Sequence, residues 1–209
     1  MPPKHKTEEQ RQQTRNAIID AARVMFIEHG VEAVTMREIA KKVGYSPTAL
    51  YLHFADRDAI LQAICDTDFL ALASGIQAIM REPDLIKRLN LLAYGYAQFA
   101  LSHPNHYRLM FMTPRVCDPE ASSLQKENPE QDAYAQLKLV VKEAFDAGCF
   151  RPELSDAELI AQTLWAGIHG VCSLQIALAS DAWVNWRDIE QRLNLMQESL
   201  LRGLLKQNI

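Results

Sequence analysis

The chain has 209 residues, of which 48% are hydrophobic and 23% charged, and its formal net charge is −4. This composition predicts a globular protein with a sizeable core, and it excludes a disordered chain or a uniformly basic nucleic-acid-binding tail. The charge is uneven, because residues 1–60 carry 9 Lys and Arg against 8 Asp and Glu, so that this part is +1 and the remainder −5. We therefore expect phosphate to approach the N-terminal part.

A helix is predicted over the first thirty residues. Thr7 and Gln10 match a capping box, and Gly30 supplies a stop after the run. The apolar residues between them recur at helical spacing and would be buried against the following helices: Ile18, Ala22, Met25 and Phe26. The basic residues near its start either extend a phosphate-facing surface or belong to a solvated tail: Lys4, Lys6, Arg11 and Arg15.

Two shorter helices are predicted next, separated by a tight turn. Thr35 and Glu38 form a second capping box, and Gly44 supplies a left-handed stop. Ser46 can then cap a further helix whose first residue is Pro47. Two brief helices joined by a glycine-containing turn match the helix-turn-helix, whose second helix places its first side chains in the DNA major groove.

The second helix of this pair has two distinct faces. Leu50 and Phe54, four residues apart, would seat the helix on its own domain. Thr48, Tyr51 and His53 would then face outward, toward DNA.

These elements, taken in order, resemble the N-terminal domain of the TetR/AcrR family of bacterial transcriptional regulators. The resemblance covers about the first third of the chain. It depends on the A-x-x-x-F…G pattern from Ala22 to Gly30, the T-x-R-x-I-A run at 35–40 and the LYLHF run at 50–54. Two positions depart from the family pattern: Leu52, where an aromatic or long residue is common, and Arg57, where a phosphate-contacting lysine is usual. Arginine can keep that phosphate role.

The resemblance implies a repressor-type dimer on a palindromic operator, and the motif assigns the DNA contacts residue by residue. The phosphate contacts would come from Tyr51, His53 and Arg57, together with N–H groups near Thr35 and Ser46. The base-edge contacts would come from Arg37, Tyr45, Thr48 and Ala49, with Lys42 as a further DNA contact. For each residue the alternative is a solvated helix face or a structural cap.

The rest of the chain is predicted to be helical, with no good strand alternation. A long helix begins at about Asp56 and ends before Pro83, and further helices are expected at 85–103, from Pro104, and at 129–147, 156–179 and 186–206. The expected fold is therefore all-α. Residues 1–55 would form a three-helix helix-turn-helix DNA-binding domain, and residues 56–209 a larger helical effector-binding and dimerisation domain.

The run WAGIHG at 165–170 is distinctive, because two glycines within one helix cost roughly 1 kcal/mol each relative to alanine. Close approach of another helix would explain them. The segment resembles a TetR subgroup named for its Trp-His-Gly signature, which implies that the last two helices pair with their copies in a homodimer. The residues expected in that bundle are Leu164, Ile168, Val171, the stretch 174–178, Leu193, Met196, Leu200 and Leu204. Packing inside one chain is the alternative.

Aromatic and polar residues of the expected effector-binding domain could line an effector cavity. The expected effector-binding residues are Phe69, Tyr94, Gln98, Phe99, Tyr107, Phe111, Trp165 and His169. A mostly apolar ligand preferring one body conformation would lower DNA affinity by its differential binding energy. The alternative is ordinary core packing.

Several other classes are excluded by missing patterns. The four cysteines lie far apart, which predicts neither a zinc site nor a disulfide framework and fits a reducing cytoplasm. No signal peptide is apparent, and the charge-free stretch 159–180 carries too many polar residues for a membrane span. No Glu-x-x-His pair, phosphate-binding glycine loop or nucleophile elbow occurs, so we expect neither an enzyme nor a cofactor or metal. The expected partners are double-stranded operator DNA, a second copy of the chain and an unknown small effector. A transcriptional activator or a regulator controlled by a protein partner stays open.

Overall fold

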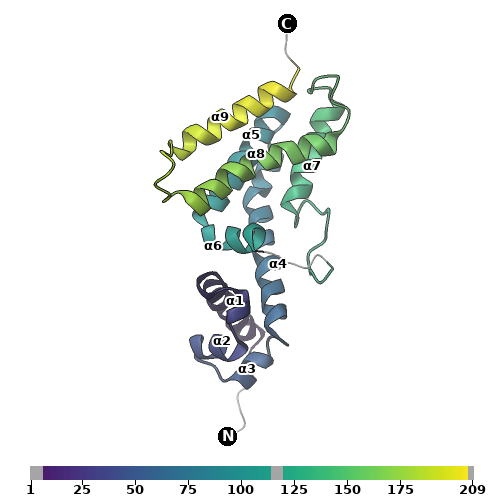
Figure 1. Ribbon diagram of the computed structural model, residues 1–209. Coiled ribbons are helices and arrows are strands. Elements are labelled where there is room, and N and C mark those ends of the chain that lie inside the picture. Colours follow the sequence, from purple (N-terminus) through teal and green to yellow (C-terminus); the bar gives the residue numbers. More distant parts are fainter. Residues whose placement is uncertain (1–6, 114–119, 207–209) are drawn as a thin grey trace. The chain divides into compact units, whose positions relative to one another are not determined.

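In a computed structural model, residues 7–113 and 120–206 are described, and within these ranges the chain forms nine α-helices and no β-strand (Figure 1). An isolated antiparallel bridge joins Phe150 to Leu205. The all-α prediction is therefore confirmed. Lys4, Lys6 and Cys117 lie outside the described residues.

Contacts divide the chain into two units. Residues 1–68 and 105–123 form one, called here the N-terminal unit, and residues 69–104 and 124–209 form the other, the C-terminal unit. Helix α4, Arg57–Ile76, contributes residues to both units. The expected domain boundary between residues 55 and 56 falls inside the N-terminal unit. The division at this point into a DNA-binding and an effector-binding domain stays a prediction.

The N-terminal unit begins with three helices: α1 at Glu8–His29, α2 at Met36–Lys42 and α3 at Pro47–Tyr51. The start of α4, the last three residues of the short α6 at Pro104–Tyr107 and a π-helical turn at Arg108–Met112 also belong to it. Helix α1 begins at the predicted Thr7 capping box and ends at Gly30, which has a φ of 82°. The fully buried core of the unit includes Ile18, Ile39, Leu50, Ile60 and Ile64.

A buried Arg–Asp ion pair and a neighbouring histidine join three helices of this unit, and the sequence did not predict this contact. Arg23 on α1 is 5% exposed and Asp68 on α4 is 1% exposed. The Arg23 guanidinium donates to both Asp68 carboxylate oxygens, at 3.1 and 2.7 Å, and also to Asp20 at 2.7 Å. His106 Nδ1 of α6 lies 2.9 Å from Asp68 Oδ1.

Cysteine pairing differs from expectation at one position. Cys65 on α4 is buried and disulfide-bonded. The sequence predicted no disulfide framework, and Cys65 departs from that expectation, because the spacing of cysteines along the chain does not reveal a single pairing. Cys149 and Cys172 are free, and burial raises the pKa of the Cys172 thiol to about 12.

The C-terminal unit is a bundle of four helices together with the end of α4. These helices are α5 at Leu85–Ser102, α7 at Ala133–Asp146, α8 at Ala157–Leu178 and α9 at Ile189–Leu204. Helix α8 packs against α5, α7 and α9. Helices α7 and α9 begin three or four residues later than predicted, because Asp132 and Asp188 supply the caps that accept the free N–H groups.

The two glycines of α8 play different parts. A Cβ on Gly167 would collide with the side chain of Leu200 and come within 2.8 Å of the Met196 sulfur, both on α9. The predicted close approach of another helix is therefore confirmed for Gly167. A Cβ on Gly170 would meet no described atom within 4 Å, so packing inside the chain does not require that glycine.

The same packing removes several residues from the expected dimer surface. Leu164, Ile168 and Leu193 are each 5% exposed and lie inside the bundle. Their assignment to a shared interface is therefore wrong, because a helix with two apolar stripes can turn either one inward. Leu174 and Leu178, in contrast, are 45% and 40% exposed.

Two helical stretches among the described residues are long and apolar enough to cross a membrane, Arg57–Arg81 and Ala157–Leu178. Length and composition alone make this match, and the core helix of a globular protein meets the same criterion. Helix α8 packs on three neighbours, which accounts for its apolar character.

Candidate functional site

Helices α2 and α3 are fixed by local hydrogen bonds at the start of α2 and in the turn between the two helices. The Thr35 hydroxyl accepts from the Glu38 N–H at 3.3 Å, and Glu38 Oε2 accepts from the Thr35 N–H at 2.8 Å. Gly44 has a φ of 74°, and the Tyr45 N–H reaches back to the Ala40 carbonyl at 2.9 Å. This left-handed residue ends α2 and leaves the chain free to start a new helix at once.

Helix α3 starts from the predicted cap. Ser46 Oγ accepts from the Ala49 N–H at 3.2 Å, and Pro47 occupies the first helical position. Leu50 is fully buried and Phe54 is 3% exposed, so that these two residues seat the helix as predicted. Arg15 of α1 covers the Phe54 ring at 4.1 Å and donates to the His53 carbonyl at 3.1 Å. Arg15 therefore makes structural contacts, which the alternative interpretation of this residue as part of a solvated tail does not include.

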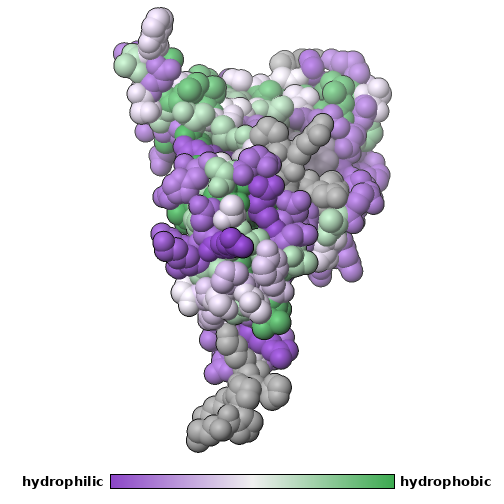
Figure 2. Space-filling model, turned by 60° about the horizontal axis from the view of Figure 1, so that its bottom comes forward, coloured by the Kyte–Doolittle hydropathy of each residue, from purple (hydrophilic) through white to green (hydrophobic). Residues whose placement is uncertain are grey.

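The predicted DNA-contacting side chains lie mostly on the exposed side of these helices. Tyr51 is 53% exposed and Leu52 is 83% exposed. Thr35, Arg37, Lys42, Ser46 and Thr48 are also exposed, whereas Tyr45, Ala49, His53 and Arg57 are half-buried. On the face drawn in Figure 2, hydrophilic residues cover most of the surface and hydrophobic residues form separate patches.

Arg57, Tyr45 and Thr35 form further contacts within the N-terminal unit. Arg57 donates to the Val31 carbonyl and to Glu32, both at 3.1 Å, and its side chain is 27% exposed. The Tyr45 hydroxyl lies 3.4 Å from the Thr14 hydroxyl. The Thr35 N–H, expected near a phosphate, donates to Glu38, and this hydrogen bond lowers the pKa of the Glu38 carboxyl. Phosphate binding at Thr35 or Arg57 would therefore compete with an internal acceptor.

The expected effector residues are divided between the two units. Tyr107 and Phe111 belong to the N-terminal unit, where their rings lie 5.0 Å apart. The other six belong to the C-terminal unit: Phe69, Tyr94, Gln98, Phe99, Trp165 and His169. Gln98 is exposed, and Phe99 stacks on His103 with ring centroids 5.1 Å apart.

Trp165 and His169 belong to an aromatic array inside the C-terminal unit. The two rings are 5.9 Å apart, and Tyr96 OH lies 2.9 Å from His169 Nδ1. Tyr134 packs against Trp165 at 5.3 Å and donates to Glu158 at 2.6 Å. Burial, followed by the Glu158 contact, raises the pKa of Tyr134 to about 12, and burial lowers the pKa of His169. The array is thus a closely packed cluster with two neutral polar groups.

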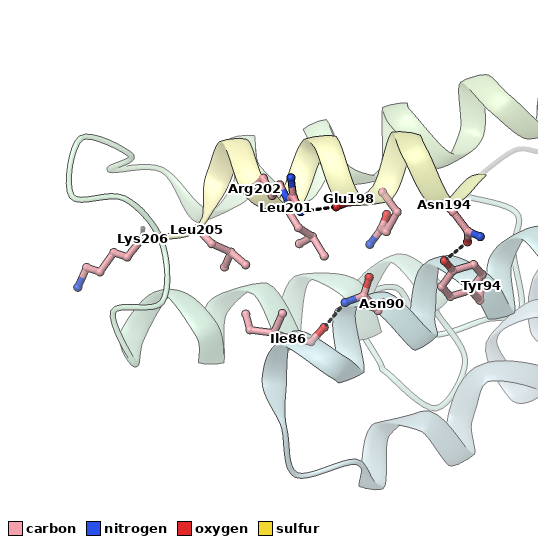
Figure 3. Close-up of a pocket in the computed structure, with 10 residues that line it drawn as sticks. Ile86, Asn90, Tyr94, Asn194, Glu198, Leu201, Arg202, Leu205 and Lys206 are labelled. Atoms are coloured by element: carbon pink, nitrogen blue, oxygen red, sulfur yellow. Dashed lines mark hydrogen bonds and ion pairs between the residues drawn. The ribbon is translucent and has the colours of Figure 1, made fainter. Parts of the chain in front are cut away.

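A groove of about 720 Å³ lies elsewhere in this unit, between α5 and α9. Figure 3 shows Ile86, Asn90 and Tyr94 on the α5 side, facing Asn194, Leu201 and Leu205. Gln197, Glu198, Arg202 and Lys206 also line it. Among the expected effector residues, only Tyr94 belongs to this lining. Amphipathic periodicity showed that both helices have polar faces, but it contains no signal for a gap between them.

Among the described residues, no three His, Cys, Asp or Glu side chains are grouped so that they could hold a metal ion.

Comparison with known proteins gives consistent matches along the chain. The profile of bacterial regulatory proteins of the tetR family matches residues 18–64, and that of the tetracyclin repressor-like C-terminal domain matches residues 89–196, more than half the chain. The HTH-type transcriptional regulator TtgR of Pseudomonas putida is 28% identical in an alignment of 177 residues that covers 79% of this chain and 81% of TtgR.

Two further similarities extend this result. The HTH-type transcriptional activator FasR of Mycolicibacterium smegmatis is 27% identical over 135 residues, 64% of this chain but only 62% of FasR. A solved structure of a Rhodococcus sp. RHA1 protein of unknown function is 26% identical, with a TM-score of 0.74 over 99% of this chain and 100% of that one. The sequence similarity and the structural similarity therefore agree over nearly the whole length of the chain.

Proposed function

The chain belongs to the tetR family of bacterial regulatory proteins, and on that premise we propose that it is a homodimeric transcriptional repressor whose two copies of α3 read a palindromic operator. The family consists of DNA-binding regulators and not of enzymes. A palindrome requires two reading helices about one DNA turn apart, which a single chain cannot supply.

The observation that carries this proposal is the construction of α3. Its buried side, Leu50 and Phe54, fixes the helix, while Thr48 and Tyr51 project from its exposed side. A helix of five residues is too short to persist without such anchoring. The predicted phosphate contacts set the register, and Arg37, Tyr45, Thr48 and Ala49 supply groups suited to base edges.

The exposed apolar side chains of α8 and α9 are the proposed dimer surface. Leu159, Leu174 and Leu178 of α8 are 58%, 45% and 40% exposed, and Leu195 of α9 is 67% exposed. The open space beside Gly170 would admit the partner's helix at close range. Burying such side chains contributes about 25 cal/mol for each Å² removed from water, which favours association.

Control by a small, mostly apolar effector is the second part of the proposal. Within the C-terminal unit the array around Trp165 and His169 supplies aromatic surface and polar groups of the kind that ligand sites use. A ligand that favours a conformation of the dimer in which the two copies of α3 are wrongly spaced for the operator would release the DNA. We place this activity in the cytoplasm, where the operator lies.

An activator is the alternative role, because one relative, FasR, is named an activator. Control by a protein partner is the alternative to a small effector. Both alternatives keep the same DNA-binding surface. A reporter gene fused downstream of the selected operator decides between repressor and activator. Deletion of the regulator should raise expression of the reporter if the protein is a repressor and lower it if the protein is an activator.

The DNA-binding surface is tested by replacing Tyr51. After selection of bound oligonucleotides, we expect Tyr51→Ala to weaken operator binding about tenfold, and Tyr51→Phe, which loses only the hydroxyl, to weaken it less. Lys142→Gln, an exposed substitution on α7, serves as the control and should leave binding unchanged. Equal affinities of wild type and Tyr51→Ala at every salt concentration would remove α3 from the interface.

A further inference from the structure

The groove between α5 and α9 contains a buried polar atom that lacks a partner. Gln197 is 3% exposed, and its Oε1 receives no hydrogen bond from any of the described residues. Leaving a buried acceptor unpaired costs about 1–3 kcal/mol. Because Gln197 also lines the groove, rotation of its side-chain amide would turn this oxygen toward a ligand that supplies the missing donor.

The floor and the two ends of the groove differ in chemistry. Ile86, Leu201 and Leu205 present apolar surface (Figure 3). At one end, the Tyr94 hydroxyl donates to Asn194 Oδ1. This pair bridges α5 and α9 and closes that end with polar groups.

The other end carries a positive charge. Arg202 pairs with Glu198 at 2.6 Å, so Lys206 supplies the net charge of the three lining residues. Its side chain extends away from Leu201 and Leu205 in Figure 3, with Nζ beside Gly148, and it would have to turn back to meet a ligand. The backbone holds Lys206 in place, because its N–H donates to the Cys149 carbonyl at 2.9 Å and the Arg151 N–H donates to the Leu204 carbonyl at 2.9 Å. An anionic group on a ligand would therefore be favoured here.

We propose that this groove is a ligand-binding site for an amphipathic anion, with an apolar body on the leucines, an N–H or O–H donor toward Gln197 and a carboxylate toward Lys206 and Arg202. Its volume of 720 Å³ lies within the range of small-molecule sites. The site is distinct from the array around Trp165 and His169. The inference does not depend on DNA binding, because occupancy of the groove can be measured without DNA.

Three acyl-amino-acid probes separate the three requirements. N-octanoylglycine has an apolar chain, an amide N–H and a carboxylate. N-octanoylsarcosine has an N-methyl group in place of that N–H, and N-octanoylglycine methyl ester lacks the charge. Isothermal titration of the full chain below micellar concentrations should rank N-octanoylglycine first, by about fivefold to tenfold over each of the others.

Variants of the lining then locate the binding. Gln197→Leu should weaken N-octanoylglycine about fivefold to tenfold and leave N-octanoylsarcosine nearly unchanged, because only the first probe loses a hydrogen bond. Lys206→Gln should weaken both acids about twofold to fivefold and spare the ester. The matched control, Lys142→Gln on α7, removes a lysine outside the groove and should change nothing.

Folding is checked separately from binding. Gln197→Leu removes an unpaired buried oxygen, so its thermal midpoint should equal or exceed that of the wild type. No binding of N-octanoylglycine, equal binding of all three probes, or equal affinity of wild type and Gln197→Leu would overturn the proposal. A shift in the dimer dissociation constant of Gln197→Leu, with no change in probe affinity, would also overturn it by assigning the groove to a second copy.

Discussion

The pair α2 and α3 and the pair α8 and α9 are both helix pairs, but different interactions hold them. In the first pair, each helix end is fixed by hydrogen bonds between residues three to five positions apart, such as Ser46 with Ala49 and Ala40 with Tyr45. In the second pair, Gly167 admits side chains from α9 that lie about thirty positions later in the chain. The helix pair that carries the predicted DNA contacts is thus specified locally, whereas the C-terminal unit depends on packing between distant residues.

The largest expected effect comes from a long-range contact in the N-terminal unit, which is an exception to this contrast. Asp68→Asn removes the charge that the buried Arg23 guanidinium contacts through two hydrogen bonds. An uncompensated buried charge is costly, so we expect the free energy of unfolding in urea to fall by about 3 kcal/mol. This loss would show that the locally specified unit still relies on one long-range contact.

The control for this prediction is the other acidic partner of Arg23. Asp20 also contacts the guanidinium at 2.7 Å, but its side chain is 72% exposed. Asp20→Asn should therefore lower the free energy of unfolding by less than about 1 kcal/mol. Similar losses for both variants would mean that burial does not distinguish the two carboxylates.

The two glycines of α8 sharpen the contrast from the C-terminal side. Gly167→Ala introduces a methyl group against Leu200 and Met196, and we expect a loss of about 1–3 kcal/mol of unfolding free energy by thermal or urea unfolding. Gly170→Ala meets nothing within 4 Å in the described chain, so its higher helix propensity should stabilise the monomer by up to about 1 kcal/mol.

The dimer adds a second measurement to this pair. If the partner's helix occupies the space beside Gly170, sedimentation should show weaker dimerisation of Gly170→Ala although its fold is no less stable. A destabilised Gly170→Ala monomer would contradict the assigned packing.

Local specification explains which features the sequence predicts well. The caps at Thr7, Thr35 and Ser46 and the stops at Gly30 and Gly44 all form as predicted, because each depends on neighbours within one helical turn. The starts of α7 and α9 were predicted too early, at a proline and a tryptophan. Nearby aspartates cap those helices more effectively.

Long-range features could not be predicted in the same way. Arg23 and Asp68 are 45 positions apart, and Asp68 and His106 are 38 apart, so no periodicity connects them. The family resemblance implied an interface on α8 but did not show which apolar stripe would turn inward, and Leu164 and Ile168 proved to be buried. The groove at Gln197 depends on the separation of two helices, a property that neither helix carries alone.

Loss of the α3 cap should give a smaller effect, confined to the reading surface. Ser46→Ala removes the acceptor of the Ala49 N–H, at a cost of about 1 kcal/mol to a helix of five residues. We expect operator affinity to fall about fivefold by titration. Asp156→Ala, which removes the corresponding cap of the 22-residue α8, should leave operator affinity unchanged, because packing holds that helix. Equal losses would show that caps matter similarly in both regions.

The smallest effect concerns pH and the array in the C-terminal unit. Burial lowers the pKa of His169, so the folded chain favours the neutral imidazole beside the Tyr96 hydroxyl, whereas the unfolded chain binds a proton near the ordinary value of 6.5. The contribution of neutral His169 to the free energy of unfolding is therefore complete above about pH 6.5. It is lost as the pH falls through the lowered pKa of His169 in the folded chain. Urea unfolding at pH 7.5 and 5.5 should show a steeper loss in wild type than in His169→Gln, which keeps a polar group without a titrating ring. The difference between the two slopes isolates His169 from the carboxylates, which titrate alike in both proteins. Parallel slopes would mean that this imidazole is as well solvated in the folded chain as in the unfolded one, and the region around Trp165 would then be open to water rather than closely packed.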